Sequence, residues 1–131
     1  MFPPRVLAVA LAATLLTAPA TQALAGASPP VKTEAGLLVG MSGMTLYTFD
    51  TDTTGSGKSA CNGPCAQNWP PLLAADADRG SGSGDYSVVT RDDGSKQWAY
   101  KGRPLYFWSK DAKPGDTSGD GVKGVWRVAR P

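Results

Sequence analysis

The chain has 131 residues, of which 13 are Lys or Arg and 11 are Asp or Glu, and it contains no histidine. The absence of histidine excludes Ser-His-Asp and Cys-His catalytic sites, zinc sites with histidine ligands and histidine-ligated haem. The charge is nearly balanced and Lys and Arg do not cluster, so we expect no nucleic-acid partner.

The first residues, 1–25, have the outline of a signal peptide. Arg5 is their only charged residue, and the run 6–16 consists almost wholly of Ala, Leu and Val. An apolar run of about a dozen residues is too short to span a bilayer, and Ala23-Leu24-Ala25 offers a cleavage site before Gly26. We therefore expect cleavage there, with a retained N-terminal membrane anchor as the alternative. No later segment of the sequence is apolar enough to be expected to span a membrane.

The rest of the chain contains a duplicated motif. Residues 43–52 and 102–111 align without a gap on the pattern G-x-x-L-Y-x-[FW]-x-x-D. Its defining residues are Leu46, Tyr47, Phe49 and Asp52 in the first copy and Leu105, Tyr106, Trp108 and Asp111 in the second. The sequence therefore predicts two related repeats, at about 31–72 and 86–129, within a single domain over residues 26–131.

Each copy of the motif begins at a turn signal between two extended runs. Ser42-Gly43 follows the run 37–41, and Lys101-Gly102 follows the run 97–100. X-Gly between such runs predicts a hairpin, because glycine adopts positive φ without steric cost. Further strands are expected at 31–33, 86–91, 96–100 and 125–129, with turns at 35–36 and 92–94 and a Gly- and Ser-rich loop at 76–85. We expect a mainly β fold of two antiparallel hairpin or meander repeats, with one short helical turn near the cysteines.

The aromatic residues of the two copies fall on one face of the expected strands. Tyr47 and Phe49 face one side because strand side chains alternate, and Tyr106 and Trp108 occupy the equivalent face. We interpret this face as part of the core, since a small domain has few other bulky residues. The alternative is an exposed aromatic platform that stacks on a sugar ring or another planar ligand. The remaining aromatic partners are Trp69, Trp98 and Trp126.

The chain has two cysteines, Cys61 and Cys65, and export favours a disulfide between them. If Pro64 begins a helical turn, residues four apart lie at about 6 Å, within the Cα range of a disulfide. Their C-x-x-x-C spacing excludes covalent haem attachment and a thioredoxin-like site. The alternative is a Cu(I) site formed with Met41 and Met44, because that metal prefers soft sulfur ligands.

Four aspartates lie in expected turns or directly before them. Asp116 and Asp120 belong to D-T-S-G-D-G, which resembles the start of a calcium loop, but its twelfth position is Arg127. We interpret this segment as a turn, with a weak Ca²⁺ site as the alternative. Asp52 and Asp111 end the aromatic strands, where we expect their carboxylates to accept N–H bonds from the following turn. An acid–base pair of these two carboxylates is the alternative.

Three motifs extend over nearly all of residues 26–131. L-Y-x-[FW]-x-x-D occurs twice, C-x-G-x-C-A-x-x-W-P-P-L lies between the copies, and G-D-x-x-G-D-G precedes the final tryptophan. Together they resemble the bacterial secreted-repeat lipoprotein family of unknown function. The resemblance implies export and supplies no activity. Members that resemble this chain are often lipoproteins, whereas no cysteine follows Ala25 here, so we expect a periplasmic or secreted form without a lipid anchor.

The leading functional hypothesis from the sequence is a non-catalytic extracytoplasmic module, with a binding or envelope-associated role and no cofactor. The missing histidine, the near-neutral charge and the aromatic hairpins favour it. The alternative is a redox or Cu(I)-handling protein that uses Cys61 and Cys65, and a histidine-free enzyme with two catalytic carboxylates is a third hypothesis. The sequence identifies no partner and no oligomeric state.

Overall fold

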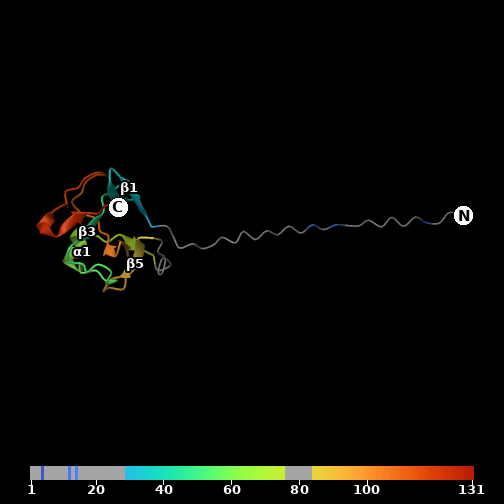
Figure 1. Ribbon diagram of the computed structural model, residues 1–131, viewed down its shortest axis with the longest axis horizontal. Helices are drawn as coiled ribbons and strands as arrows, with labels where there is room; N and C mark the ends of the chain where they lie inside the picture. The colour runs from blue at the N-terminus through green and yellow to red at the C-terminus, as the bar shows by residue number, and fades with distance from the viewer. Residues whose placement is uncertain (1–3, 5–11, 13, 15–28, 76–83) are drawn as a thin grey trace.

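The computed structural model describes residues 29–75 and 84–131, together with the isolated residues 4, 12 and 14. Apart from those three residues, the expected signal peptide lies outside this part, as does most of the expected loop at 76–85. The elements are β1 (Val31–Glu34), β2 (Leu37–Gly40), β3 (Tyr47–Phe49), α1 (Pro64–Asn68), β4 (Leu73–Ala74), β5 (Tyr86–Thr90), β6 (Lys96–Tyr100), β7 (Arg103–Pro104), the 3-10 helix η2 (Val122–Gly124) and β8 (Trp126–Val128). The structure confirms a mainly antiparallel β fold with one short α-helix (Figure 1). No helix among the described residues is long and apolar enough to cross a membrane.

Two tight turns close the hairpins β1–β2 and β6–β7. Ala35-Gly36 joins the first pair of strands and Lys101-Gly102 joins the second. All four turn residues have positive φ, between 48° and 78°. Positive φ at both central residues is the requirement of a type I′ turn, whose twist matches that of the flanking strands. The structure thus confirms both predicted turns.

The predicted hairpin around Ser42-Gly43 is shorter than expected. After this turn β2 meets the chain again at one bridge, between Val39 and Thr45. The next strand, β3, leaves β2 and pairs instead with β8 at the other end of the chain. Alternation in the sequence predicted the strand at residues 47–49, but it carries no information about the partner of that strand.

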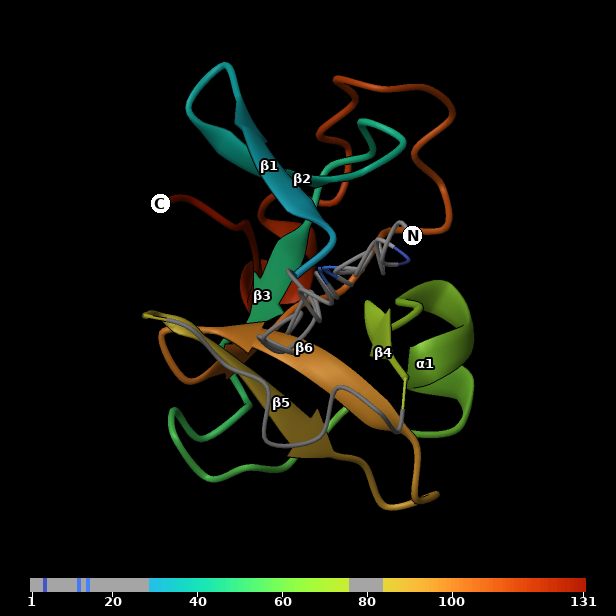
Figure 2. The same ribbon diagram turned by 90° about the vertical axis from the view of Figure 1, so that its right-hand side faces the viewer.

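The last strand of each repeat pairs with a strand of the other repeat. β8, which ends the second repeat, pairs with β3 of the first, and β4, which ends the first repeat, pairs with β6 of the second. Figure 2 shows β3 between the β1–β2 hairpin and the β5–β6 sheet. The two repeats therefore exchange their terminal strands.

Backbone bonds repeat on the two sides of this exchange. Leu38 N–H donates to the Ala129 carbonyl at 2.9 Å, and Trp98 N–H donates to the Leu72 carbonyl at the same distance. Between these sites, residues 47 and 106 exchange reciprocal N–H···O=C bonds of 2.8 and 3.0 Å. The same bonds thus recur on both sides of the pair formed by residues 47 and 106. This arrangement is the one expected for an approximate two-fold axis that passes through the pair.

The buried residues form two clusters on opposite faces of the strands. The first contains Leu38, Leu46, Leu72, Trp98, Leu105 and Ala129. The second contains Tyr47, Cys61, Trp69, Tyr106 and Trp126, with Phe49 and Trp108 packed against it and partly exposed. Leu46 and Tyr47 fall in different clusters because successive strand residues point to opposite faces. The aromatic face is thus core, as predicted, while Trp98 belongs to the other, leucine-rich cluster.

We predict that neither repeat folds alone, because each lacks a strand that the other supplies. Produced separately, residues 26–79 and 80–131 are expected to give poorly dispersed ¹H–¹⁵N NMR spectra. Mixing the halves under oxidising conditions is expected to restore the dispersion of the intact chain, which is the control. A well-dispersed spectrum from either half alone would contradict the strand exchange.

Candidate functional site

Each tyrosine of the duplicated motif donates a hydrogen bond to the aspartate of the other repeat. The Tyr47 hydroxyl donates to Asp111 Oδ2 at 2.6 Å, and the Tyr106 hydroxyl donates to Asp52 Oδ2 at 2.6 Å. All four side chains are buried. The motif residues that the sequence placed in equivalent positions are therefore joined across the two repeats, which ties the exchanged strands together from inside the core.

The second oxygen of each carboxylate accepts bonds from the loop that follows it. Asp52 Oδ1 accepts the Ala60 N–H at 2.6 Å, and Asp111 Oδ1 accepts the N–H and the hydroxyl of Ser118 at 3.0 and 2.6 Å. The sequence predicts backbone N–H partners from the turn directly after each aromatic strand. The donors instead lie eight and seven residues further along the chain, and the strand of the second copy, β7, already ends at Pro104. Every oxygen of both carboxylates thus accepts a hydrogen bond from a loop or from a tyrosine.

Burial sets the ionisation of the groups in this network. Burial raises the pKa of Asp52, and the bonds from Tyr106 and Ala60, with nearby Arg91, only partly offset it. Burial and the bond to a carboxylate also raise the pKa of both tyrosines, Tyr47 and Tyr106, far above the usual range. Both hydroxyls therefore keep their protons and remain donors.

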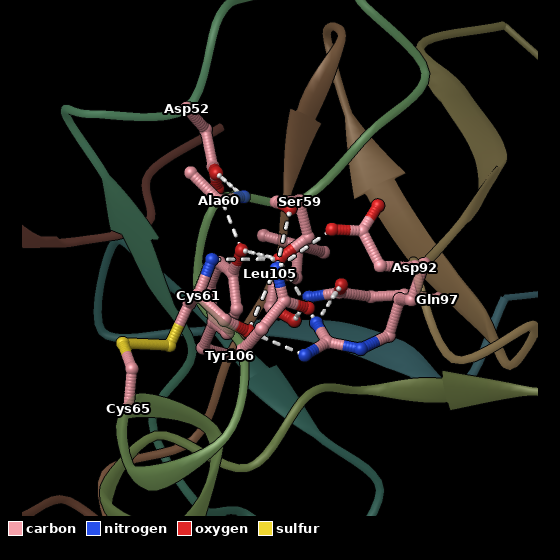
Figure 3. Close-up of a disulfide and its surroundings, with 11 residues drawn as sticks. Asp52, Ser59, Ala60, Cys61, Cys65, Asp92, Gln97, Leu105 and Tyr106 are labelled. Atoms are coloured by element: carbon pink, nitrogen blue, oxygen red, sulfur yellow. Dashed lines mark hydrogen bonds between the residues drawn. A yellow bond between two sulfur atoms is a disulfide. The ribbon is translucent and has the colours of Figure 1, made fainter.

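A buried arginine, which the sequence did not single out, joins the network. The Arg91 guanidinium donates to Ser59 Oγ at 3.0 Å, to Gln97 Oε1 at 2.7 Å and to the Cys61 carbonyl. Ser59 Oγ lies 2.6 Å from the Tyr106 hydroxyl, and Figure 3 shows Ser59, Gln97 and Tyr106 gathered around the disulfide loop. A buried charge is stable where its donors are satisfied. In the sequence, Arg91 directly precedes an exposed D-D-G turn, so its sequence context does not indicate that it is buried.

The two cysteines form a disulfide across the start of α1. Their Cα atoms lie 5.2 Å apart, and Pro64 occupies the first turn of the helix. Cys61 is buried and Cys65 is partly exposed. Because the two sulfurs are bonded to each other, neither is a thiolate, which a Cu(I) site with Met41 and Met44 would need. Met41 is 64% exposed and Met44 is half-buried.

The carboxylates of Asp116 and Asp120 bind nearby backbone. Asp116 Oδ2 accepts the N–H groups of Ala112 and Lys113 at 2.9 and 3.1 Å, and Asp120 Oδ1 accepts that of Val128 at 3.2 Å. Bonds of this kind favour the interpretation of this segment as a turn. Among the described residues, no group of three or more His, Cys, Asp or Glu side chains is placed to hold a metal ion.

Four aromatic rings form a stacked column through the second buried cluster. In order along the column they are Phe49, Trp126, Trp69 and Trp108, with centroid separations of 4.2, 3.7 and 4.0 Å and interplanar angles of 8°, 4° and 27°. Successive rings come from alternate repeats. Tyr47 meets Trp69 edge-on at 5.3 Å, and Tyr106 meets Trp126 edge-on at 5.1 Å. The aromatic column therefore joins the repeats a second time.

Gly119 leaves space for the aromatic column. A Cβ at this position would lie 2.7 Å from Cη2 of Trp69 and 2.9 Å from Cε1 of Tyr47. The Gly119 N–H also donates to the Tyr47 hydroxyl at 3.3 Å. The middle glycine of G-D-x-x-G-D-G is thus required by packing against the column, which the sequence pattern alone did not reveal.

A pocket of about 310 Å³ lies beside the column. It is lined by α1, by the segment containing η2 and by the rings of Phe49, Trp69 and Trp126. α1 directly precedes Trp69, and η2 precedes Trp126 by one residue, so corresponding segments of the two repeats line the same pocket. The side chains that line it are far apart in the chain, so no local motif marks it.

Lys123 is the charged residue of this lining within the described residues. Its φ is 52°, whereas side-chain-bearing residues rarely adopt this left-handed conformation, which costs roughly 1–2 kcal/mol. Backbone strain of this kind is found at ligand sites more often than elsewhere, where surrounding structure holds it in place. Lys123 was not among the residues that the sequence singled out.

The intertwined repeats define a duplicated β domain held by its own motif residues. Residues 30–73 and 87–130 match the family model described as a secreted repeat of unknown function. The match covers more than half of the chain, so the chain belongs to this family, which confirms the resemblance found in the sequence and implies export. No curated protein and no solved structure matches the chain.

We predict that Tyr106→Phe lowers the free energy of unfolding by about 2 kcal/mol, because it removes a donor to a buried carboxylate. Urea unfolding followed by tryptophan fluorescence measures the change. Tyr100→Phe is the matched control, since the Tyr100 hydroxyl has no hydrogen-bond partner among the described residues, and it is expected to cost less than about 0.5 kcal/mol. Equal losses in the two variants would contradict the role of the tyrosine–aspartate bond.

We predict that Asp52 titrates above its ordinary pKa of 3.8 in the folded protein. The folded state then binds this proton more tightly than the unfolded state does. Protonated Asp52 therefore stabilises the folded state fully at a pH below the pKa of the unfolded state. This contribution is lost as the pH rises through the pKa of Asp52 in the folded state. Carboxyl ¹³C NMR measures the midpoint, and Asp93 is the control because its bond from Ser95 lowers its pKa. A midpoint for Asp52 at or below that of Asp93 would refute the prediction.

Proposed function

We propose that the protein is a non-catalytic binding module that acts in the periplasm or outside the cell, with the pocket beside the aromatic column as its ligand site. The observation that carries the proposal is the position of this pocket. Its lining includes rings of the column that both repeats build, namely Phe49, Trp69 and Trp126. A site on elements that are fixed by the core is already formed before a ligand binds, which reduces the entropic cost of binding.

The hydrogen bonds of Asp52 and Asp111 support a structural role for these carboxylates, which are the groups that an acid–base enzyme would use. Both carboxylates are buried, and each accepts a bond from a tyrosine and from a backbone N–H. A general acid or base needs access to the reacting group. The pocket, by contrast, is bounded mainly by aromatic rings and by residues from both ends of α1. Apolar walls with a few polar groups are typical of small-molecule sites.

The position of the disulfide supports a structural role for the cysteines. Cys61 is buried, and its carbonyl accepts a bond from the Arg91 guanidinium. The disulfide thus fixes the start of α1 against the buried network, and α1 forms one wall of the pocket. By the chain-entropy estimate, so small a ring contributes about 2 kcal/mol to stability.

We predict that small-molecule fragments bind the native chain and that Asn68→Trp abolishes the binding. Asn68 lines the pocket and is exposed, so an indole at this position fills the pocket without entering the core. Gln67→Trp is the matched control, because Gln67 lies on the same helix and is exposed but does not line the pocket. Ligand-observed NMR with a fragment library measures binding.

Fragments lost in Asn68→Trp and retained in Gln67→Trp would support the proposal. If no fragment binds the native chain, or if every fragment binds both variants equally, the pocket is not the ligand site.

A further inference from the structure

We infer that the pocket binds a small planar aromatic molecule that carries a carboxylate or a similar oxyanion. This inference rests on the proposed function of the pocket and adds the chemical class of its ligand. Three independent features of the lining lead to it: the ring edges that face the pocket, the free indole N–H groups and the unpaired cation at Lys123.

The tryptophans of the pocket present edges rather than faces. Trp126 has Phe49 stacked on one face and Trp69 on the other. Trp69 likewise has Trp126 on one face and Trp108 on the other. Both rings nevertheless line the pocket, so only their edges are available there. Aromatic edges carry partial positive charge and attract oxyanions and the face of another ring.

The indole N–H groups of these two rings have no partner among the described residues, although the side chains are almost wholly buried. Trp69 is 4% exposed and Trp126 is 2% exposed. No fully buried side-chain nitrogen or oxygen in the described part lacks a hydrogen-bond partner, so each indole nitrogen reaches the surface. Both rings line the pocket, which makes its wall the nearest place for their small exposed area and the position that the proposal assigns to the two indole N–H groups. A ligand oxygen can therefore accept from two donors that the protein leaves unused.

Lys123 adds a cation to the same lining. It is exposed, and within the described residues it forms no ion pair. The nearest acidic residue to Lys123 in the chain, Asp120, accepts the Val128 N–H at 3.2 Å, and Asp50, next to Phe49, is paired with Arg127 at 2.8 Å. The lining therefore has one uncompensated positive charge beside two indole donors, an arrangement complementary to an oxyanion.

The size and the walls of the pocket limit the rest of the ligand. A volume of about 310 Å³ is at the lower end of small-molecule sites. The ring of Phe49 and the edges of two indoles favour a flat aromatic body, since edge-to-face contact between rings is attractive. One or two fused rings with an anionic group meet both conditions. 2-Naphthoate is a probe with these properties, and 2-naphthamide is its neutral counterpart.

We predict that 2-naphthoate shifts the indole N–H signals of Trp69 and Trp126 in ¹H–¹⁵N NMR titrations of the intact protein. Lys123→Gln is expected to weaken binding about three- to fivefold, as the loss of an exposed charge pair does, while Lys123→Arg retains it. The matched control is Lys110→Gln. The Lys110 ammonium lies 5.6 Å from the ring of Trp108, at the other end of the column, so its loss is expected to leave binding unchanged.

The outcomes separate this inference from the proposed function. If 2-naphthamide binds as tightly as 2-naphthoate and Lys123→Gln has no effect, the oxyanion assignment is wrong and the pocket remains a ligand site. If neither probe shifts the two indole signals, the assignment of a planar aromatic ligand is wrong. In that case the comparison of Asn68→Trp with Gln67→Trp in the fragment screen decides whether the pocket binds ligands at all.

Discussion

The hydrogen bonds between the tyrosine of one repeat and the aspartate of the other are the interactions on which this structure depends. A carboxylate buried in an apolar core is strongly unfavourable unless donors surround it. Asp52 accepts one bond and Asp111 two bonds from their own following loops, and each accepts one more from the tyrosine of the opposite repeat. Neither aspartate is fully satisfied within its own repeat, so the two repeats must fold together.

The same bonds orient the aromatic column and, through it, the pocket. With their hydroxyls bound to the carboxylates, Tyr47 and Tyr106 make T-shaped contacts with the two central indoles, Trp69 and Trp126. The indoles stack on each other, and the partly exposed Phe49 and Trp108 extend the stack at either end. Packing of the core therefore also forms the wall of the pocket.

Local sequence patterns predicted most elements of this fold, but they did not predict which distant residues contact one another. Alternation and X-Gly turns located most of the strands, but they missed β4 and predicted a longer strand in the second copy than β7. The spacing of Cys61 and Cys65 indicated their disulfide. The pairing of β3 with β8 joins residues 47–49 to residues 126–128, and periodicity does not specify so distant a partner. Arg91 stands beside a polar turn, and Lys123 lies in a glycine-rich loop, so both read as surface residues in the sequence.

Duplication within one chain has a consequence for the proposed ligand site. Lys123 stands three residues before Trp126, and Ala66 stands at the same distance before Trp69, so one repeat supplies a cation where the other supplies a methyl group. A homodimer of identical single repeats would carry the same residue, either Lys or Ala, at this position in both copies. Because the two repeats lie in one chain, the sequence of each can change independently. A nearly symmetric fold can therefore have a pocket that distinguishes the two ends of a small molecule.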